Sequence, residues 1–186
     1  MMRTGFVYCT PDSRSSKPSY SSPRINGPKL AEAAPEATLA PVTVGAGEGE
    51  RLADFTTDLI GGGEFHLAEE QGRVVVINLW ATYCAPCVEE LPHFEALAEA
   101  HPDDLTVLAI HHKTGAKKAE KYLADKGWDH IRFTRDSADK GLFDLVNGSE
   151  AMPQTIVLNR EGEVIYNAQA PVTYAQLEAL YARARG

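Results

Sequence analysis

Residues 74–92, VVVINLWATYCAPCVEELP, constrain the fold more than any other part of the chain. The stretch opens with the β-branched run Val74–Ile77, and such an apolar run between polar ends is typical of a strand buried on both faces of a parallel sheet. After the two cysteines, apolar residues recur at helical spacing, at Val88, Leu91, Phe94 and Ala98. We therefore expect Cys84 and Cys87 where a central strand ends and a helix begins.

The spacing of the two cysteines predicts redox chemistry. Two intervening residues at the start of a helix let both sulfurs approach disulfide distance with little movement of the backbone. Cys84 falls at the helix N-terminus, where free N–H groups and the helix dipole favour a thiolate. Cys87 lies one turn deeper, as suits a resolving thiol, and Pro86 fits the first turn, where a missing N–H costs nothing.

A Cys-X-X-Cys pair also occurs as half of a zinc site. That kind of site needs a second cysteine pair, or a histidine pair at ligand spacing. The only other cysteine is Cys9, in a polar N-terminal segment, and no two histidines are separated by three to five residues. We predict no metal and no cofactor beyond a redox-active Cys84–Cys87 disulfide.

Residues 80–87, WATYCAPC, followed by Glu90-Leu91-Pro92, resemble the thioredoxin-like thiol–disulfide oxidoreductases of the TlpA/ResA type. These are reductases of the bacterial cell envelope, related in fold to the redoxin superfamily. The resemblance covers roughly Leu52 to the C-terminus. It implies a thioredoxin fold with an added N-terminal β-hairpin, and an enzyme that reduces protein disulfides.

The pattern along the chain predicts the same α/β architecture. Residues 54–59 and 64–67 flank three glycines, which is a hairpin signal. Strands are then expected at 105–110, 131–133, 154–158 and 163–166, and helices at 116–126, 138–145 and 174–183. This alternation implies a mixed central sheet flanked by helices. We place this thioredoxin-like domain at residues 51–186.

Residues 1–50 are predicted to be a disordered tail and linker. Residues 1–29 are rich in Ser and Pro, and residues 30–50 in Ala, Pro, Glu and Gly, so neither part buries enough apolar surface to offset its ordering entropy. Phe6-Val7-Tyr8 is too short for the apolar core of a secretory signal. Tyr8 is also bulky where a lipidation site needs a small residue, so Cys9 is expected to be a lone tail cysteine.

The distribution of charge bears on partners. The net charge is −8, but the first 29 residues carry five basic side chains against Asp12 alone, so the remaining residues hold −12. This acidic remainder, residues 30–186, argues against nucleic acid as a partner, because nucleic-acid binding needs a basic surface. The resemblance instead implies disulfide-containing client proteins, a membrane electron donor of the thiol-reductase type and a monomeric protein.

The location in the cell is predicted from two observations. The sequence contains no run of 18 apolar residues, so it predicts no transmembrane helix. The resemblance implies an extracytoplasmic protein that is tethered to or near the membrane, and a cytoplasmic location is the alternative.

A second motif, Met152-Pro153, precedes a predicted strand. It reads either as an ordinary edge-strand proline or, by resemblance, as the family's cis-proline, which faces the cysteines across the site. A cis bond would point the Met152 backbone outward, where it could pair with an extended substrate segment. Other residues expected to contact substrate are Trp80, Tyr83, Ala85 and Pro86, although Trp80 could instead be a core residue.

Glu90 is the third catalytic candidate beside the two cysteines. It lies three residues after Cys87, hence on the same helical face, and matches the family's acidic residue near the thiols. The alternative is a solvated glutamate like Glu89. Asn78 stands where thioredoxins proper carry a buried Asp, which increases the interest of Glu90 as a proton relay.

His111 and His112 end the second long predicted strand. Adjacent strand residues face opposite ways, so the two side chains cannot both reach the cysteines. We expect a role at the edge of the loop rather than a metal-binding or catalytic role.

The expected mechanism is thiol–disulfide exchange, in which Cys84 attacks a substrate disulfide and Cys87 resolves the mixed disulfide. The reduction potential, and so the direction, is not encoded in a readable motif; the resemblance favours a reductant, with roles in cytochrome c maturation or antioxidant defence. Two alternatives are a peroxiredoxin-like peroxidase, which would need a T-x-x-C context, and a copper-delivery protein, which would need a wider cysteine spacing and a His ligand.

Overall fold

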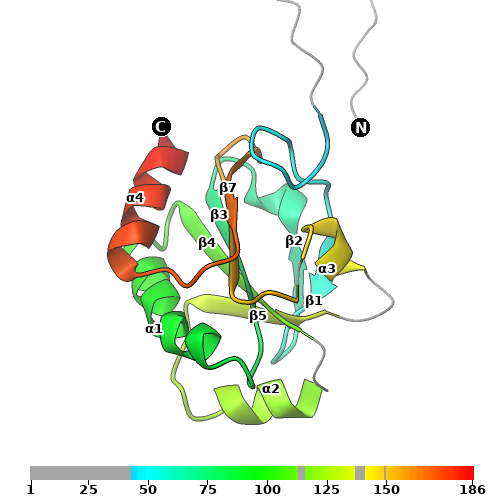
Figure 1. Cartoon of the computed structure of the whole chain (residues 1–186), viewed down its shortest axis with the longest axis vertical. Helices are drawn as coiled ribbons and strands as arrows, with labels where there is room; N and C mark the ends of the chain where they lie inside the picture. Colours follow the sequence, from blue (N-terminus) through cyan, green and yellow to red (C-terminus); the bar gives the residue numbers. More distant parts are fainter. Residues whose placement is uncertain (1–42, 113–115, 137–140, 149) are drawn as a thin grey trace, which may run out of the picture. The chain divides into compact units, whose positions relative to one another are not determined.

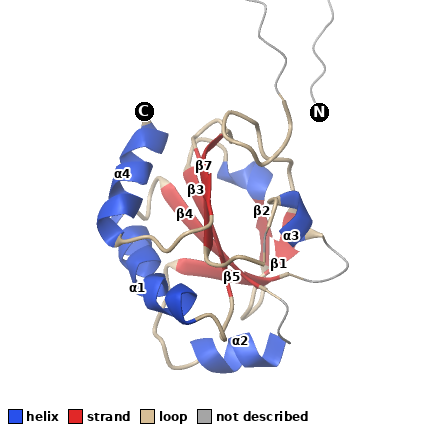
Figure 2. Cartoon of the chain, in the orientation of Figure 1, coloured by secondary structure: helices blue, strands red, loops and turns tan. Residues whose placement is uncertain are grey.

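The computed structural model describes residues 43–112, 116–136, 141–148 and 150–186. Their main feature is a five-stranded sheet of order β5-β4-β3-β6-β7 (Figures 1 and 2). β3, β4 and β5 run parallel, and β6 and β7 run antiparallel to their neighbours, so the predicted mixed sheet is confirmed. The sheet strands are β3 (Val74–Trp80), β4 (Leu105–His111), β5 (Ile131–Arg135), β6 (Gln154–Leu158) and β7 (Val164–Ala168).

Helices and a hairpin surround this sheet. The helices are α1 (Ala85–Ala100), α2 (Ala116–Leu123), α3 (Leu142–Leu145), α4 (Tyr174–Arg185) and the 3-10 turn Leu67–Glu70. β1 (Thr56–Asp58) and β2 (Glu64–His66) form a separate antiparallel pair, which confirms the predicted N-terminal hairpin. The predicted helix at 138–145 is described only as the short α3, because residues 137–140 lie outside the described residues.

β3 lies between two apolar clusters, because successive strand residues point to opposite faces. Val74, Val76 and Trp80 pack with α1 and α4, which lie side by side over one face of the sheet (Figure 1). The residues between them, Val75, Ile77 and Leu79, pack with Phe65 of the hairpin and Leu142 of α3 on the other face. All seven residues of β3 are buried, as the apolar run predicted.

The structure corrects the predicted linker over residues 43–50, which pack against the domain. The backbone N–H groups of Gly49 and Val164 donate to the carbonyls of Val164 and Glu50, both at 2.8 Å, and Ala46 is buried. Pairing with the edge strand β7 supplies hydrogen bonds that the Gly- and Glu-rich composition does not indicate. The prediction for residues 1–42, including Cys9, lies outside the described residues. Within the described residues, no helix has the length and apolar character needed to cross a bilayer.

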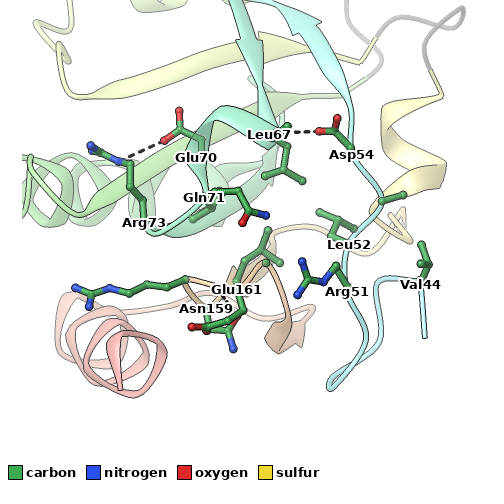
Figure 3. Close-up of a pocket in the computed structure, with 16 residues that line it drawn as sticks. Val44, Arg51, Leu52, Asp54, Leu67, Glu70, Gln71, Arg73, Asn159 and Glu161 are labelled. Atoms are coloured by element: carbon green, nitrogen blue, oxygen red, sulfur yellow. Dashed lines mark hydrogen bonds and ion pairs between the residues drawn. The ribbon is translucent and has the colours of Figure 1, made fainter. Parts of the chain in front are cut away.

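A cavity of about 450 Å³ lies at the opposite end of the sheet from the cysteines (Figure 3). Val75, near the start of β3, lines it together with Leu158, its partner at the end of β6. Val75 and Trp80 are five positions apart along β3, roughly 17 Å at 3.3 Å per residue. None of residues 80–87 lines the cavity, so it is not the place where the cysteines react.

A buried glutamate beside this cavity ties three segments together. Glu70 accepts a hydrogen bond from the Thr106 hydroxyl at 2.6 Å and pairs with Arg73, Nε to Oε2, at 3.3 Å (Figure 3 shows the Arg73 pair). Its other oxygen accepts from Arg132 at 2.5 Å. Glu70 is 6% exposed and Thr106 is 4% exposed, so removal of the carboxylate leaves the buried Thr106 hydroxyl without this acceptor.

We therefore expect Glu70→Ala to lower the free energy of unfolding by about 2 kcal/mol. Most of this change comes from the buried polar group that loses its partner, because ion pairs with partly exposed arginines contribute little. Urea unfolding measures this change. The neighbouring Glu69 is exposed, so Glu69→Ala serves as the control, with an expected change below about 0.5 kcal/mol. Equal effects of the two substitutions would contradict a structural role for the buried carboxylate.

Candidate active site

Cys84 and Cys87 form a disulfide at the start of α1, as their spacing predicted. The S–S distance is 2.02 Å and the two Cα atoms are 5.3 Å apart. Cys84 is the N-cap residue of α1, with extended backbone angles, and its Sγ accepts a hydrogen bond from the Cys87 N–H at 3.3 Å. The strand therefore ends, the chain turns over residues 81–84, and the helix presents its free N–H groups to the Cys84 sulfur.

The two sulfurs differ in accessibility. Cys84 is partly exposed, whereas Cys87 is fully buried in the cluster between the sheet and α1. The surface around Cys84 is formed by three of the predicted contact residues: Tyr83 is 59% exposed, and Ala85 and Pro86 are also exposed. An incoming group from outside the protein meets Cys84 first.

The structure corrects the expectation that Trp80 contacts substrate. Its side chain is fully buried and packs edge-on against the rings of His111 and Phe133. It is therefore a core residue, the alternative that the sequence left open. It faces inward because it is the last residue of β3 on the side covered by α1.

The Met152–Pro153 peptide bond is cis, as the resemblance implied. Gln154, the next residue, pairs with Leu79 in the antiparallel register of β6 and β3, so Met152 and Pro153 lie beside the end of β3, next to the cysteine turn. Met152 is half-buried and packs on the same cluster as Cys84. The structure thus brings the two predicted motifs together, and binding of a client by the Met152 backbone stays a prediction.

Glu90 belongs to the buried face of α1 and is not a solvated helix glutamate. Its carboxylate, 2% exposed, accepts one hydrogen bond from the Asn78 side chain at 2.7 Å and another from the backbone N–H of Val172 at 2.9 Å. Burial raises its pKa from the ordinary 4.5 to about 7, against the smaller opposing effects of the two hydrogen bonds. By contrast, Glu89 is exposed.

This raised pKa predicts a stability difference that depends on pH. Below about pH 4.5 Glu90 is protonated in both the folded and the unfolded chain, so its contribution to stability is fully present; it is lost as the pH rises through about 7. The upper bound on the loss is about 3 kcal/mol, at 1.36 kcal/mol per pKa unit. Glu90→Gln should remove this loss. Urea unfolding of both oxidised proteins from pH 5 to pH 8 measures it, and parallel pH profiles would contradict the assignment.

Sequence reasoning missed the contact that His111 makes. Its ring is fully buried, and Nε2 accepts a hydrogen bond from the backbone N–H of Thr82 at 3.3 Å, two residues before Cys84. Burial, and to a smaller degree the neighbouring His112, lower its pKa to about 4. The sequence carried no signal for this contact, because it depends on the parallel register that places His111, the last residue of β4, beside Trp80. His112 faces the opposite way and stacks on Phe143, as strand alternation predicted.

Two further contacts of the site show different degrees of predictability. Asn78 is the one polar residue within the apolar strand, and a buried amide requires a partner; the sequence therefore carried a signal for its bond to Glu90. Val172 carries no such signal, because it acts through its backbone and lies 82 residues from Glu90.

Comparison with known proteins supports this description. The sequence profile of the Redoxin family matches residues 47–181. The thioredoxin-like protein YneN of Bacillus subtilis is 37% identical over 86 residues, which cover 46% of this chain and 50% of YneN. The thiol-disulfide oxidoreductase ResA of Halalkalibacterium halodurans is 29% identical over 119 residues, covering 63% of this chain and 65% of ResA. The chain thus spans between half and two thirds of these curated relatives.

Solved structures show the same fold. A thiol:disulfide interchange protein of the thioredoxin family from Chlorobium tepidum superimposes with a TM-score of 0.68 at 19% identity, over 79% of this chain and 99% of that protein. At this level of identity the likeness establishes the thioredoxin fold, which the sequence had predicted.

Proposed function

This chain belongs to the Redoxin family, and from that membership and the geometry of its cysteines we propose that it is a thiol–disulfide oxidoreductase. The observation that carries the proposal is the Cys84–Cys87 disulfide at the N-terminus of α1, with one sulfur partly exposed and the other buried. Relatives with matching sequences carry the names thioredoxin-like protein and thiol-disulfide oxidoreductase.

The reaction begins with the reduced protein. The Cys84 thiolate attacks one sulfur of a client disulfide, which forms a mixed disulfide and releases the other client sulfur as a thiolate. Cys87 then attacks the Cys84 sulfur, which forms the Cys84–Cys87 bond and releases the second client thiolate. Two electrons pass from the protein to the client. Each released thiolate takes up a proton: one is the proton that Cys87 loses, and the other comes from the solvent, which received the Cys84 proton when that thiol ionised.

Glu90 suits the second step. Cys87 is buried and must lose its proton before it attacks. A carboxyl group with a pKa near 7 exchanges protons efficiently at neutral pH, and Glu90 lies one helical turn from Cys87 on the same helix. We assign Glu90 the role of accepting the Cys87 proton, directly or through water.

The substrate we propose is a protein disulfide. The exposed residues Tyr83, Ala85 and Pro86 form an open surface around Cys84, and the cavity of Figure 3 is at the other end of the sheet. An extended client segment could pair with the Met152 backbone, as in strand addition. By the same family resemblance, the protein acts as a monomeric reductant outside the cytoplasm, near the membrane, and a membrane thiol-reductase restores its dithiol.

A reduction-potential measurement tests the direction of the reaction. The protein is equilibrated with glutathione redox buffers, and the fraction of Cys84–Cys87 disulfide is measured by thiol alkylation. A reductant is expected to lie near thioredoxin, about −270 mV, whereas a value near that of DsbA, about −120 mV, would indicate an oxidant. Peroxide consumption and copper titration, run on the same samples, distinguish the peroxidase and copper-delivery alternatives.

A further inference from the structure

The turn that carries the nucleophile, residues 81–84, is held at two points. Within the turn, the Cys84 N–H donates to the Ala81 carbonyl at 3.0 Å. From outside the turn, His111 accepts the Thr82 N–H at 3.3 Å. The turn joins β3 to α1, so its shape determines where the Cys84 sulfur lies relative to Cys87.

His111 is rigidly placed to make this contact. It is the last residue of β4, it pairs in parallel register with Trp80, and its ring is fully buried. The Trp80 ring packs edge-on against the imidazole, with centroids 4.7 Å apart, and the His111 carbonyl accepts the Asp136 N–H at 2.9 Å. Backbone and ring are thus both fixed, and the imidazole has little freedom to leave Thr82.

The protonation state suits an acceptor. An imidazole nitrogen accepts a hydrogen bond only when it carries no proton. Because burial keeps the His111 pKa near 4, the ring is neutral at physiological pH and Nε2 is available to the Thr82 N–H. An aliphatic side chain at position 111 would fill the same space and would offer no acceptor.

We propose that His111 is a positioning residue that fixes the 81–84 turn through Thr82 and so contributes to the stability of the Cys84–Cys87 disulfide. This inference rests on the proposed function. A disulfide forms readily when its two sulfurs are held close together, and a loosened turn lets the Cys84 sulfur move away from Cys87. Loss of the acceptor should therefore favour the dithiol and make the protein more oxidising.

Three variants separate the acceptor from the packing. His111→Phe keeps a ring against Trp80 and removes the acceptor. His111→Gln removes the ring and supplies an amide oxygen near the position of Nε2. Tyr122→Leu is the packing control, because Tyr122 also contacts Trp80, with centroids 5.7 Å apart, and is not the acceptor of the Thr82 N–H.

The readouts are the equilibrium constant with glutathione and the amide exchange rate of Thr82. In His111→Phe we expect the constant for disulfide formation to fall about tenfold, which corresponds to about 30 mV for this two-electron couple, and the Thr82 amide to exchange at least tenfold faster. For His111→Gln and Tyr122→Leu, we expect both the equilibrium constant and the Thr82 amide exchange rate to stay within about threefold of the wild-type values.

Two patterns would overturn the inference. One is a wild-type equilibrium constant in His111→Phe; the other is an equal shift in His111→Gln or Tyr122→Leu, which would assign the effect to packing. If His111→Phe does not fold, a hydrogen-bond scalar coupling between the Thr82 amide and His111 Nε2 in the wild type decides the contact, and its absence refutes the inference. A wild-type protein that does not exchange with glutathione at all would refute the proposed function instead, and the Thr82 amide would still report on the contact.

Discussion

Cys84→Ser is expected to abolish insulin reduction, leaving only the background rate of the dithiothreitol that drives the assay. A serine hydroxyl is not ionised at neutral pH and does not form a mixed disulfide, so the first step of exchange has no nucleophile. The other cysteine of the pair, Cys87, is fully buried and has no access to a protein substrate. The measurement is the turbidity of precipitating insulin chains over time.

The matched control is Cys9→Ser, which also removes one thiol but outside the Redoxin match at residues 47–181. It should reduce insulin at the wild-type rate. Circular dichroism of both variants checks that the fold is retained. Substantial insulin reduction by Cys84→Ser would mean that Cys87, and not Cys84, attacks the client.

The sequence predicted those parts of this architecture that depend on local patterns. The β-branched run before the cysteines predicted a strand buried on both faces, and the CxxC spacing predicted a disulfide at a helix start. Both follow from rules that act within about ten residues. The cis-proline and the Redoxin membership followed from resemblance, which adds information that one sequence does not contain.

The features that the sequence did not predict depend on pairs of distant residues. Whether Glu90 is buried depends on Val172, 82 residues away, which donates its backbone N–H. The contact between His111 and Thr82 depends on the register of β3 and β4. Residues 43–50 are ordered because they pair with β7, more than 100 residues later, although their composition is typical of a linker. Tertiary contacts outweigh local composition in each case.

The contrast between the two cysteines leads to the second large effect. Of these two residues, Cys84 is the one accessible from outside. Cys87 lies within disulfide-bonding distance of Cys84, so it can attack the Cys84 sulfur and release a bound client. The two steps of exchange are therefore separated between two residues. A substitution of the second cysteine should stop the reaction after its first step.

Cys87→Ser is accordingly expected to accumulate mixed disulfides between Cys84 and client proteins, where the wild type leaves almost none. The Cys84 thiolate still attacks, but the serine at position 87 cannot displace the client, so the intermediate persists until an external thiol reduces it. The variant is expressed with an affinity tag, captured after thiol alkylation, and separated on non-reducing gels, with identification of the partners.

The double variant Cys84→Ser/Cys87→Ser is the control, because it retains the same surface of Tyr83, Ala85 and Pro86 and lacks both sulfurs. Bands that depend on Cys84 and vanish on reduction identify clients. If Cys84→Ser alone traps partners through Cys87 and Cys87→Ser does not, the roles of the two cysteines are reversed. Because burial of Cys87 is what forbids that reversal, such a result would also require the start of α1 to open before the reaction.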